Sequence, residues 1–154
     1  MTQTIDMGHW TLAESVEFDP DAFGFVYRMT TPEGKIYIGK KNMVKTIKRK
    51  PLKGKKRRRI CQMESDWRTY TSSSNLINED ISKNAKDNYK FEILQMVYSK
   101  FEAAYVETKY QFDYDVLFNR QYLNGIVNCR LGTVPKELQE RFDNNEFLPR
   151  TKEK

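Results

Sequence analysis

The sequence has few residues of the kinds that most often bind metal ions or exchange protons at neutral pH. It contains one histidine and two cysteines, Cys61 and Cys129, and neither cysteine is part of a Cys-x-x-Cys motif. A zinc site needs about four ligands, and isolated cysteines inside a cell are usually reduced thiols. We therefore expect neither a zinc site nor a disulfide. Any reaction at neutral pH would have to use tyrosine, lysine, a carboxylate or metal-bound water as its base.

Long apolar runs are also absent. No stretch approaches the roughly 20 residues that a membrane helix requires, and the opening residues MTQTIDMGHW lack the basic start and apolar core of a secretory signal. The sequence thus predicts a cytoplasmic protein with no membrane partner. Its 154 residues, of which 38% are hydrophobic, suffice for the core of one domain and leave the oligomeric state open.

Positive charge is concentrated in one segment. Twelve Lys and Arg residues and no acidic residue lie between Lys40 and Arg59, whereas the rest of the chain has fifteen basic and twenty-one acidic residues. Such a block favours phosphate binding, because each neutralised phosphate releases condensed counterions. A solvated loop, a nuclear-import-like signal or an RNA-binding arm has the same composition. The candidate nucleic-acid contacts in the block are Lys48, Arg49, Lys53, Lys55, Lys56, Arg57, Arg58 and Arg59.

Apolar periodicity and turn residues predict an α+β fold with a small three-stranded antiparallel sheet flanked by helices. The expected elements are strands 23–30 and 35–39 joined by a Thr-Pro-Glu-Gly turn, a basic loop 40–62, helices 63–70 and 76–83, a strand 89–98, a helix 100–118, a loop or edge strand 122–131, and a helix from Pro135. We divide the chain into an N-terminal extension 1–22, a main domain 23–131 with the basic insertion 40–62, and a C-terminal helix and charged tail 132–154.

Two clusters of polar residues could carry chemistry. Tyr27 and Tyr37 are expected on neighbouring strands, where a phenol can orient or deprotonate water, or simply pack across the strands. The segment TSSSN can cap the next helix, or it can bind a phosphate through Ser73 and Ser74. Both interpretations remain open at this point.

The predicted long helix offers two candidate carboxylates. Its expected apolar face places Glu102 and Glu107 on opposite flanks, where either could be solvated or could reach a metal ion over the edge of the sheet. The apolar face that we expect is Phe101, Ala104, Tyr105, Thr108 and Phe112. Periodicity does not choose between the two glutamates.

The hairpin resembles that of the GIY-YIG nuclease superfamily. Phe25-Val26-Tyr27 stands for the first motif, with Phe and Val replacing Gly and Ile, and Tyr37-Ile38-Gly39 matches the second. The order of hairpin, basic region, third strand, helix with Glu and loop with Asn also fits. The segments DWRTYTSSSNLINEDI, FEILQMVYSKFEAAYVETKYQF and YLNGIVNCRL are similar to small phage-encoded homing-type endonucleases, so the resemblance covers residues 23–131.

This resemblance implies a Mg²⁺-dependent (or Mn²⁺-dependent) DNA endonuclease, a phosphodiester hydrolase. Tyr27 and Tyr37 would flank the scissile phosphate, one of them as the base, and Lys40 would assist deprotonation or bind a phosphate. Glu107 would bind the metal, and Asn124 would support the phosphate or the hairpin. The family's arginine position holds Ile47 here, so Arg68 is the substitute candidate. The alternative is a nucleic-acid-binding module without catalysis that uses the same basic loop.

Overall fold

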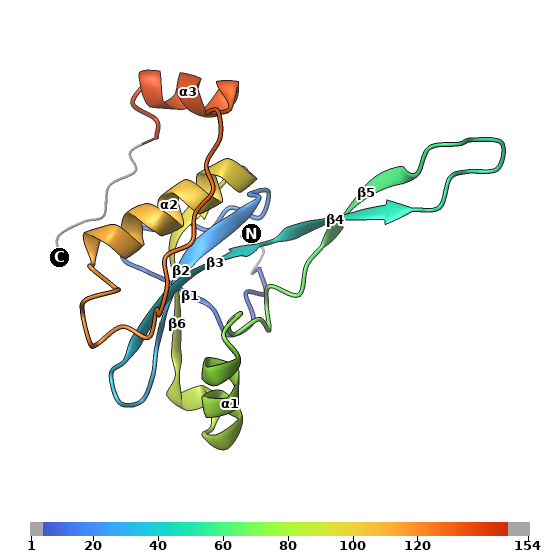
Figure 1. Ribbon diagram of the computed structural model, residues 1–154. Helices are drawn as coiled ribbons and strands as arrows, with labels where there is room; N and C mark the ends of the chain where they lie inside the picture. The colour runs from blue at the N-terminus through green and yellow to red at the C-terminus, as the bar shows by residue number, and fades with distance from the viewer. Residues whose placement is uncertain (1–4, 148–154) are drawn as a thin grey trace.

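The computed structural model describes residues 5–147, which form a mixed four-stranded sheet with helices on both of its faces (Figure 1). The strand order is β1-β6-β2-β3, where β2 (Gly24–Thr30) pairs antiparallel with β3 (Ile36–Asn42) and with β6 (Lys90–Val97). The α+β class, the hairpin and the third strand are therefore confirmed.

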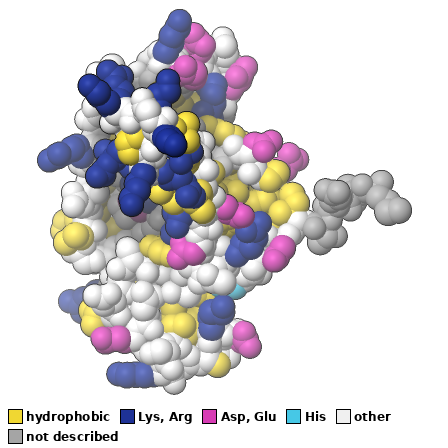
Figure 2. Space-filling model, turned by 90° about the vertical axis from the view of Figure 1, so that its right-hand side faces the viewer, with side chains coloured by type: hydrophobic (Ala, Val, Ile, Leu, Met, Phe, Trp, Pro, Cys, Tyr) yellow, Lys and Arg dark blue, Asp and Glu magenta, His cyan; other side chains and the backbone are white. Residues whose placement is uncertain are grey.

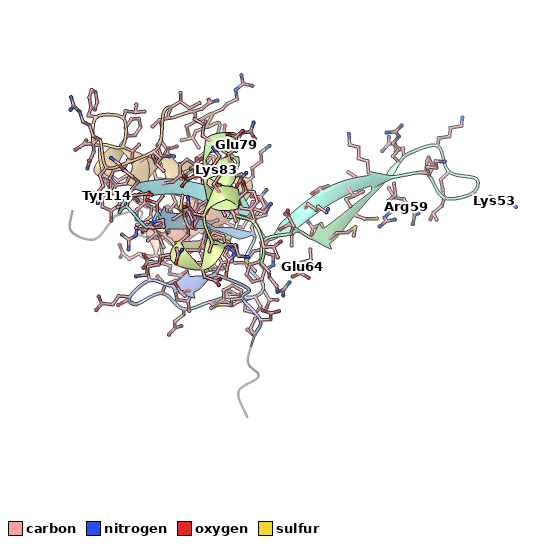
Figure 3. The ribbon with its side chains drawn as sticks, turned by 90° about the horizontal axis from the view of Figure 1, so that it is seen from below. Lys53, Arg59, Glu64, Glu79, Lys83 and Tyr114 are labelled. Atoms are coloured by element: carbon pink, nitrogen blue, oxygen red, sulfur yellow. The ribbon has the colours of Figure 1, made fainter. Side chains whose placement is uncertain are left out.

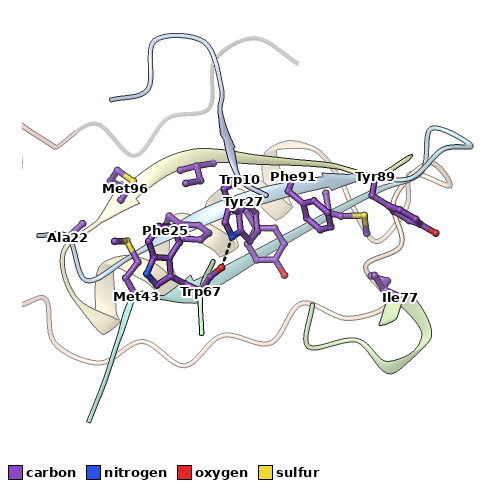
Figure 4. Packing of buried hydrophobic residues seen from close by; sticks show 12 residues of the cluster. Trp10, Ala22, Phe25, Tyr27, Met43, Trp67, Ile77, Tyr89, Phe91 and Met96 are labelled. Carbon is purple, nitrogen blue, oxygen red and sulfur yellow. Dashed lines mark hydrogen bonds between the residues drawn. The ribbon is translucent and has the colours of Figure 1, made fainter. Parts of the chain in front are cut away.

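The prediction of three strands is wrong by one. β1 (Thr11–Leu12) adds a parallel strand beside β6, with Thr11 opposite Glu92 and Leu12 opposite Ile93. Two residues are too few to produce an alternating pattern. The segment is held instead by Trp10, which is 3% exposed and whose indole N–H donates to the carbonyl of Trp67 (Figure 4).

Three of the four predicted helices form in the expected order, with differences at their ends. They are α1 (Asn75–Lys83), α2 (Lys100–Asp113) and α3 (Lys136–Asp143), and the 3₁₀ turn η1 (Lys86–Asn88) follows α1. Ser74 and Ser99 cap α1 and α2 by accepting hydrogen bonds from Ile77 and Glu102, as Ser N-caps do. α2 ends five residues earlier than expected. Within 122–131 the only pairing is an isolated bridge from Tyr122 to Ile36.

The basic insertion is a β-hairpin rather than a loop. β4 (Val44–Arg49) and β5 (Arg59–Glu64) pair antiparallel and project from the body of the protein (Figure 3). We call residues 44–64 the arm. The predicted helix 63–70 is wrong, because its first residues belong to β5. The rest forms turns around Trp67, a buried anchor that is 1% exposed.

Two hydrophobic clusters cover the two faces of the sheet. One contains Trp10, Phe25 and Tyr27 with Trp67 and Ile77, so it joins the N-terminal segment and α1 to the sheet (Figure 4). The other packs α2 and α3 on the opposite face through residues that include Val26, Ile38, Ala103, Val106 and Leu138.

The predicted apolar face of α2 is shifted. Ala103 and Val106 are buried, whereas Phe112 is 60% exposed. The prediction differs because a hydrophobic pattern assigns polar residues to solvent, and Glu102 and Gln111 are polar residues that are buried. Among residues 5–147, none of the helices has the length and apolar character needed to cross a bilayer.

Candidate active site

A cleft of about 500 Å³ opens at the free edge of β3. Tyr27 and Tyr37 lie on the sheet face that carries the Trp10 cluster, whereas α2 covers the other face. Glu107 comes from α2 and meets the phenols at the edge, where the two faces join. The residues that line the cleft are Tyr27, Tyr37, Gly39, Lys40, Tyr70, Ser73, Ser74, Glu107, Gln111, Leu123, Asn124, Gly125, Ile126 and Asn128.

The glycine of the second motif leaves room for the first tyrosine. Gly39 lies directly opposite Tyr27 in the β2–β3 register. A Cβ atom built on Gly39 would lie 2.6 Å from the Tyr27 hydroxyl oxygen, a distance that real Cβ contacts do not reach. Any larger residue at position 39 would therefore displace the Tyr27 ring from the cleft.

Three tyrosines, Tyr27, Tyr37 and Tyr70, lie close together in the cleft. The ring centroid of Tyr27 is 6.2 Å from that of Tyr37 and 6.4 Å from that of Tyr70. Ser72 and Tyr70 lie beside the Tyr27 hydroxyl, and Ser73 lies beside that of Tyr70. Burial raises the pKa of the Tyr27 phenol well above its ordinary value, and the neighbouring phenols add to this effect. Tyr27 therefore keeps its proton at neutral pH and can donate a hydrogen bond.

The two glutamates of α2 have different environments. Glu102 is 1% exposed, and its carboxylate accepts from both terminal nitrogens of Arg141, at 2.7 and 3.1 Å, and from the backbone N–H of Tyr98. The Glu102 carboxylate is thus bound by other groups of the protein, which hold it in place. Glu107 is half-buried in the cleft. Burial raises its pKa to about 7, although the charge of Lys40 and a hydrogen bond from the Lys40 backbone act in the opposite direction.

Asn124 completes the free edge of β3. Its side-chain oxygen accepts from the backbone N–H of Ile38 at 3.0 Å, and its amide nitrogen donates to the Ile38 carbonyl at 2.8 Å. Gln111 donates to the same carbonyl at 3.3 Å. Since Ile38 stands between Tyr37 and Gly39, these amides fix the strand that carries the second motif, in the way that a further strand would.

Lys40 is the only cation among the cleft-lining residues of the described chain. The structure does not bring Arg68 there. Its guanidinium stacks on the Trp67 ring, pairs with Glu64 and donates to the carbonyl of Asp6, because the turn that follows β5 directs this side chain toward the N-terminal segment. Arg68 therefore remains a candidate from resemblance alone.

Sequence reasoning left several residues in the cleft or beside it off its candidate list. Tyr70 lines the cleft, and Lys41 places its ammonium 4.0 Å from the Tyr70 ring centroid. Ser72 is buried against Tyr27, and Gln111 reaches β3 from α2. The available signal was the Tyr70–Ser74 segment, whose polar residues precede α1 and face the hairpin. Ser73 and Ser74 do line the cleft, and the Ser74 hydroxyl is already used as the cap of α1.

The donor set suits a weakly held, hydrated divalent cation. In the part of the chain that the structure describes, no group of three or more His, Cys, Asp or Glu side chains comes together. A transition-metal cage is therefore not formed there. Mg²⁺ commonly binds through one or two carboxylates and keeps several waters, with substrate phosphate completing its shell. Glu107 is a desolvated carboxylate beside open space, which fits that description.

An α+β domain with one tyrosine on each strand of its first hairpin, and a helix-borne glutamate in the adjoining cleft, has the architecture of a GIY-YIG nuclease domain. Residues 10–127 match the model of a family described as "Putative endonuclease segE, GIY-YIG domain". The match covers more than half of the chain, which therefore belongs to this family of endonuclease domains. Searches of curated proteins and of solved structures found no match.

Proposed function

We propose that this protein is a metal-dependent endonuclease that hydrolyses phosphodiester bonds in DNA. The observation that carries the proposal is the convergence of Tyr27, Tyr37, Lys40 and Glu107 on one cleft, in a chain that belongs to an endonuclease family. These residues come from the two strands of one hairpin and from a helix that begins almost 60 residues later in the sequence. Their convergence at a solvent-open edge is what a hydrolytic site requires.

The two phenols take different roles in this proposal. Tyr27 is buried and protonated, so it donates a hydrogen bond to a phosphate oxygen or positions the attacking water. Tyr37 is half-buried on the same face and is the candidate base, which would take the proton from that water as its phenolate form. Lys40 lies beside Glu107 and binds a non-bridging oxygen of the phosphate or assists the deprotonation.

Glu107 would hold the cation, Mg²⁺ or Mn²⁺. When bound, such a cation withdraws charge from the phosphate and from the leaving oxygen. Glu107 must be ionised to bind it, and its raised pKa means that only about half of the carboxylate is ionised near pH 7 in the free protein. Asn124 acts through Ile38, by holding the strand on which Tyr37 is placed.

The protein would bind DNA through contacts with the phosphate backbone, made in the cleft and along the arm. Ser73 and Ser74 line the cleft, and the arm with its cations projects from the body of the protein (Figure 3). Lys and Arg side chains bind phosphates without regard to the base, so these contacts supply affinity that depends on salt.

A module that binds nucleic acid without cutting it is the second candidate. It is favoured by one observation: within residues 5–147 no arginine lines the cleft, and Lys40 is its single cation. A phosphoryl-transfer site with one cation has less charge to stabilise its transition state.

A plasmid assay tests the first candidate against the second. Supercoiled DNA is incubated with the protein in Mg²⁺ or Mn²⁺, in EDTA, and with Glu107→Gln. Glu140→Gln, on the exposed surface of α3, is the matched control. We expect nicking that EDTA abolishes, a loss of about 10³-fold or more in Glu107→Gln, and an unchanged rate in the control. Binding by the unaltered protein without nicking in either metal would leave the binding module.

A further inference from the structure

The arm is a two-stranded ribbon with almost no core of its own. It extends away from the sheet, with Lys53 near its tip and Glu64 near its root (Figure 3). In Figure 2 the arm points toward the viewer, and Lys and Arg side chains gather around it. All residues from Lys48 to Ile60 are exposed. A ribbon of this kind is marginal by itself in water, and a partner that covers it would stabilise it.

The two faces of the ribbon differ in chemistry. Side chains alternate between faces along a strand, and directly opposed residues share a face. From the β4–β5 register, the first face carries Lys45, Ile47, Arg49, Arg59, Cys61 and Met63. The second face carries Val44, Thr46, Lys48, Ile60, Gln62 and Glu64.

The second face presents groups that read bases. Thr46 is directly opposite Gln62, and Lys48 is directly opposite Ile60. Gln side chains can pair with adenine, Lys with guanine, and an apolar group can contact the methyl of thymine. Ile60 is 70% exposed, and nothing in residues 5–147 covers it. The first face, by contrast, has three cations around half-buried Ile47 and Cys61.

The root of the arm is fixed to the body. Met43, which separates β3 from β4, is 4% exposed in the core. Its backbone N–H donates to the Phe23 carbonyl at 2.7 Å, and its carbonyl accepts from the N–H of Ser65 at 2.9 Å. Lys41 and Asp66 form an ion pair at 2.8 Å across the same junction. The arm therefore has a set direction relative to the cleft, since both begin on β3.

We propose that the arm lies in the major groove of duplex DNA, with Thr46, Lys48, Ile60 and Gln62 directed at base edges. The major groove admits a two-stranded ribbon, and its pattern of donors and acceptors is unique for each base pair. The cations of the arm tip and of the first face then reach the flanking phosphates. This inference rests on DNA as the substrate, and it assigns to the arm a preference for sequence as well as affinity.

Because the root of the arm is fixed, the bases that the arm contacts should lie at a defined distance from the cut bond. Thr46 and Lys48 are six and eight residues beyond Lys40 in the cleft. An extended chain rises about 3.3 Å per residue, and a DNA base pair about 3.4 Å. The bases that are read should therefore lie on one side of the cut bond, no more than about eight base pairs away.

The test begins with binding, so that it does not depend on cleavage. A library of random-sequence duplexes is selected by binding in EDTA, and the bound fraction is sequenced. The selected duplex is then treated with dimethyl sulfate, which methylates guanine N7 in the major groove and adenine N3 in the minor groove. We expect an enriched motif of a few base pairs, and interference at guanine N7 within it. The absence of a motif, or interference confined to adenine N3, overturns the proposal.

Two variants distinguish contacts with base edges from contacts with phosphates. Gln62→Ala should weaken binding to the selected duplex by about 5- to 100-fold and leave binding to a scrambled duplex unchanged. The control Arg59→Gln, on the other face, should weaken both duplexes by the same factor. Equal weakening by Gln62→Ala would refute base reading. A double-stranded RNA of the selected sequence is the second ligand; because its major groove is too narrow for side chains to read, tighter binding to this RNA than to the DNA duplex would refute the DNA groove.

Cleavage in Mg²⁺ shows where the cut bond lies relative to the motif. Cut ends sequenced from the same library should align at one fixed offset from the motif, within about eight base pairs. A motif with scattered cut sites would contradict the fixed root. A motif without any cutting would refute the proposed nuclease activity and would leave the groove contact standing.

Discussion

Replacing Glu107 by glutamine should make the metal-free protein more stable above pH 7 while removing its activity. The carboxylate is desolvated in the cleft, and Lys40 compensates its charge only in part. Glutamine has nearly the same shape and no charge, so it avoids the cost of holding an ion away from water.

The magnitude follows from the pKa. Moving the pKa of Glu107 from its ordinary value of 4.5 to about 7 corresponds to about 3 kcal/mol of lost stability when the group is ionised. This is an upper value, because the carboxylate is only half-buried and solvent screens it. For a domain of this size, about 3 kcal/mol corresponds to a rise of about 6–12 °C in Tm.

The sign of the pH dependence is set by which state holds the proton. Between pH 4.5 and about pH 7 the folded protein keeps the Glu107 proton and the unfolded chain releases it. Stability from this group is therefore present below pH 4.5, declines as the pH rises, and reaches its minimum above pH 7. The difference between Glu107→Gln and the unaltered protein should accordingly be small at pH 4 and largest at pH 8.

Urea unfolding of both proteins in EDTA, at intervals from pH 4 to pH 8.5, measures this difference. His9 also titrates, with its pKa lowered to about 4 by burial, but it is present in both proteins and its contribution cancels. Adding Mg²⁺ at 100 times its Kd should return about 2.7 kcal/mol to the unaltered protein and nothing to the variant. A stability difference that does not change with pH would refute a desolvated Glu107, and with it the basis of the metal assignment.

Two further predictions concern the arm and the C-terminal helix. Replacing the six cations between Lys53 and Arg59 by glutamine should lower the salt slope of DNA binding by up to about 5, measured by fluorescence anisotropy at several salt concentrations; an unchanged slope would mean that the arm tip does not reach the phosphates. Arg141→Met should destabilise the protein by about 3–5 kcal/mol in urea unfolding, because it leaves the Glu102 carboxylate buried and unpaired. Adding Glu102→Gln should recover most of that loss, and no recovery would indicate that the pair is not the cause.

The strands of the central sheet could be predicted because their patterns are local. β2 and β6 alternate or run apolar over seven and eight residues, and Gly34 takes a φ of 86° in the turn that its sequence indicates. The arm could not be predicted in the same way. Its strands are held by backbone pairing, and their charged side chains show no apolar alternation. β1 is too short for any pattern.

The candidate site was only partly accessible from sequence. Periodicity left Glu102 and Glu107 equivalent, and only the resemblance chose Glu107. The structure separates their environments through Arg141, which is 39 residues beyond Glu102 and binds it. Which residue pairs with a buried charge depends on the tertiary structure and not on the local sequence. For the same reason, neither the hydrogen bonds of Asn124 to Ile38 nor the contact of Tyr70 with the cleft follows from spacing.

Cleft and arm share a single strand direction, and this has a physical consequence. β3 supplies Tyr37 and Lys40 to the cleft, and β4 continues from it after Met43 alone. A flexible link would let the arm add affinity without position, because the cations could find phosphates anywhere nearby. An anchored link removes that freedom before DNA binds, so less entropy is lost in the complex and the distance between contact and cut is fixed. In the proposed complex, the buried Met43 junction is therefore the element through which the arm would define where a bond is cut.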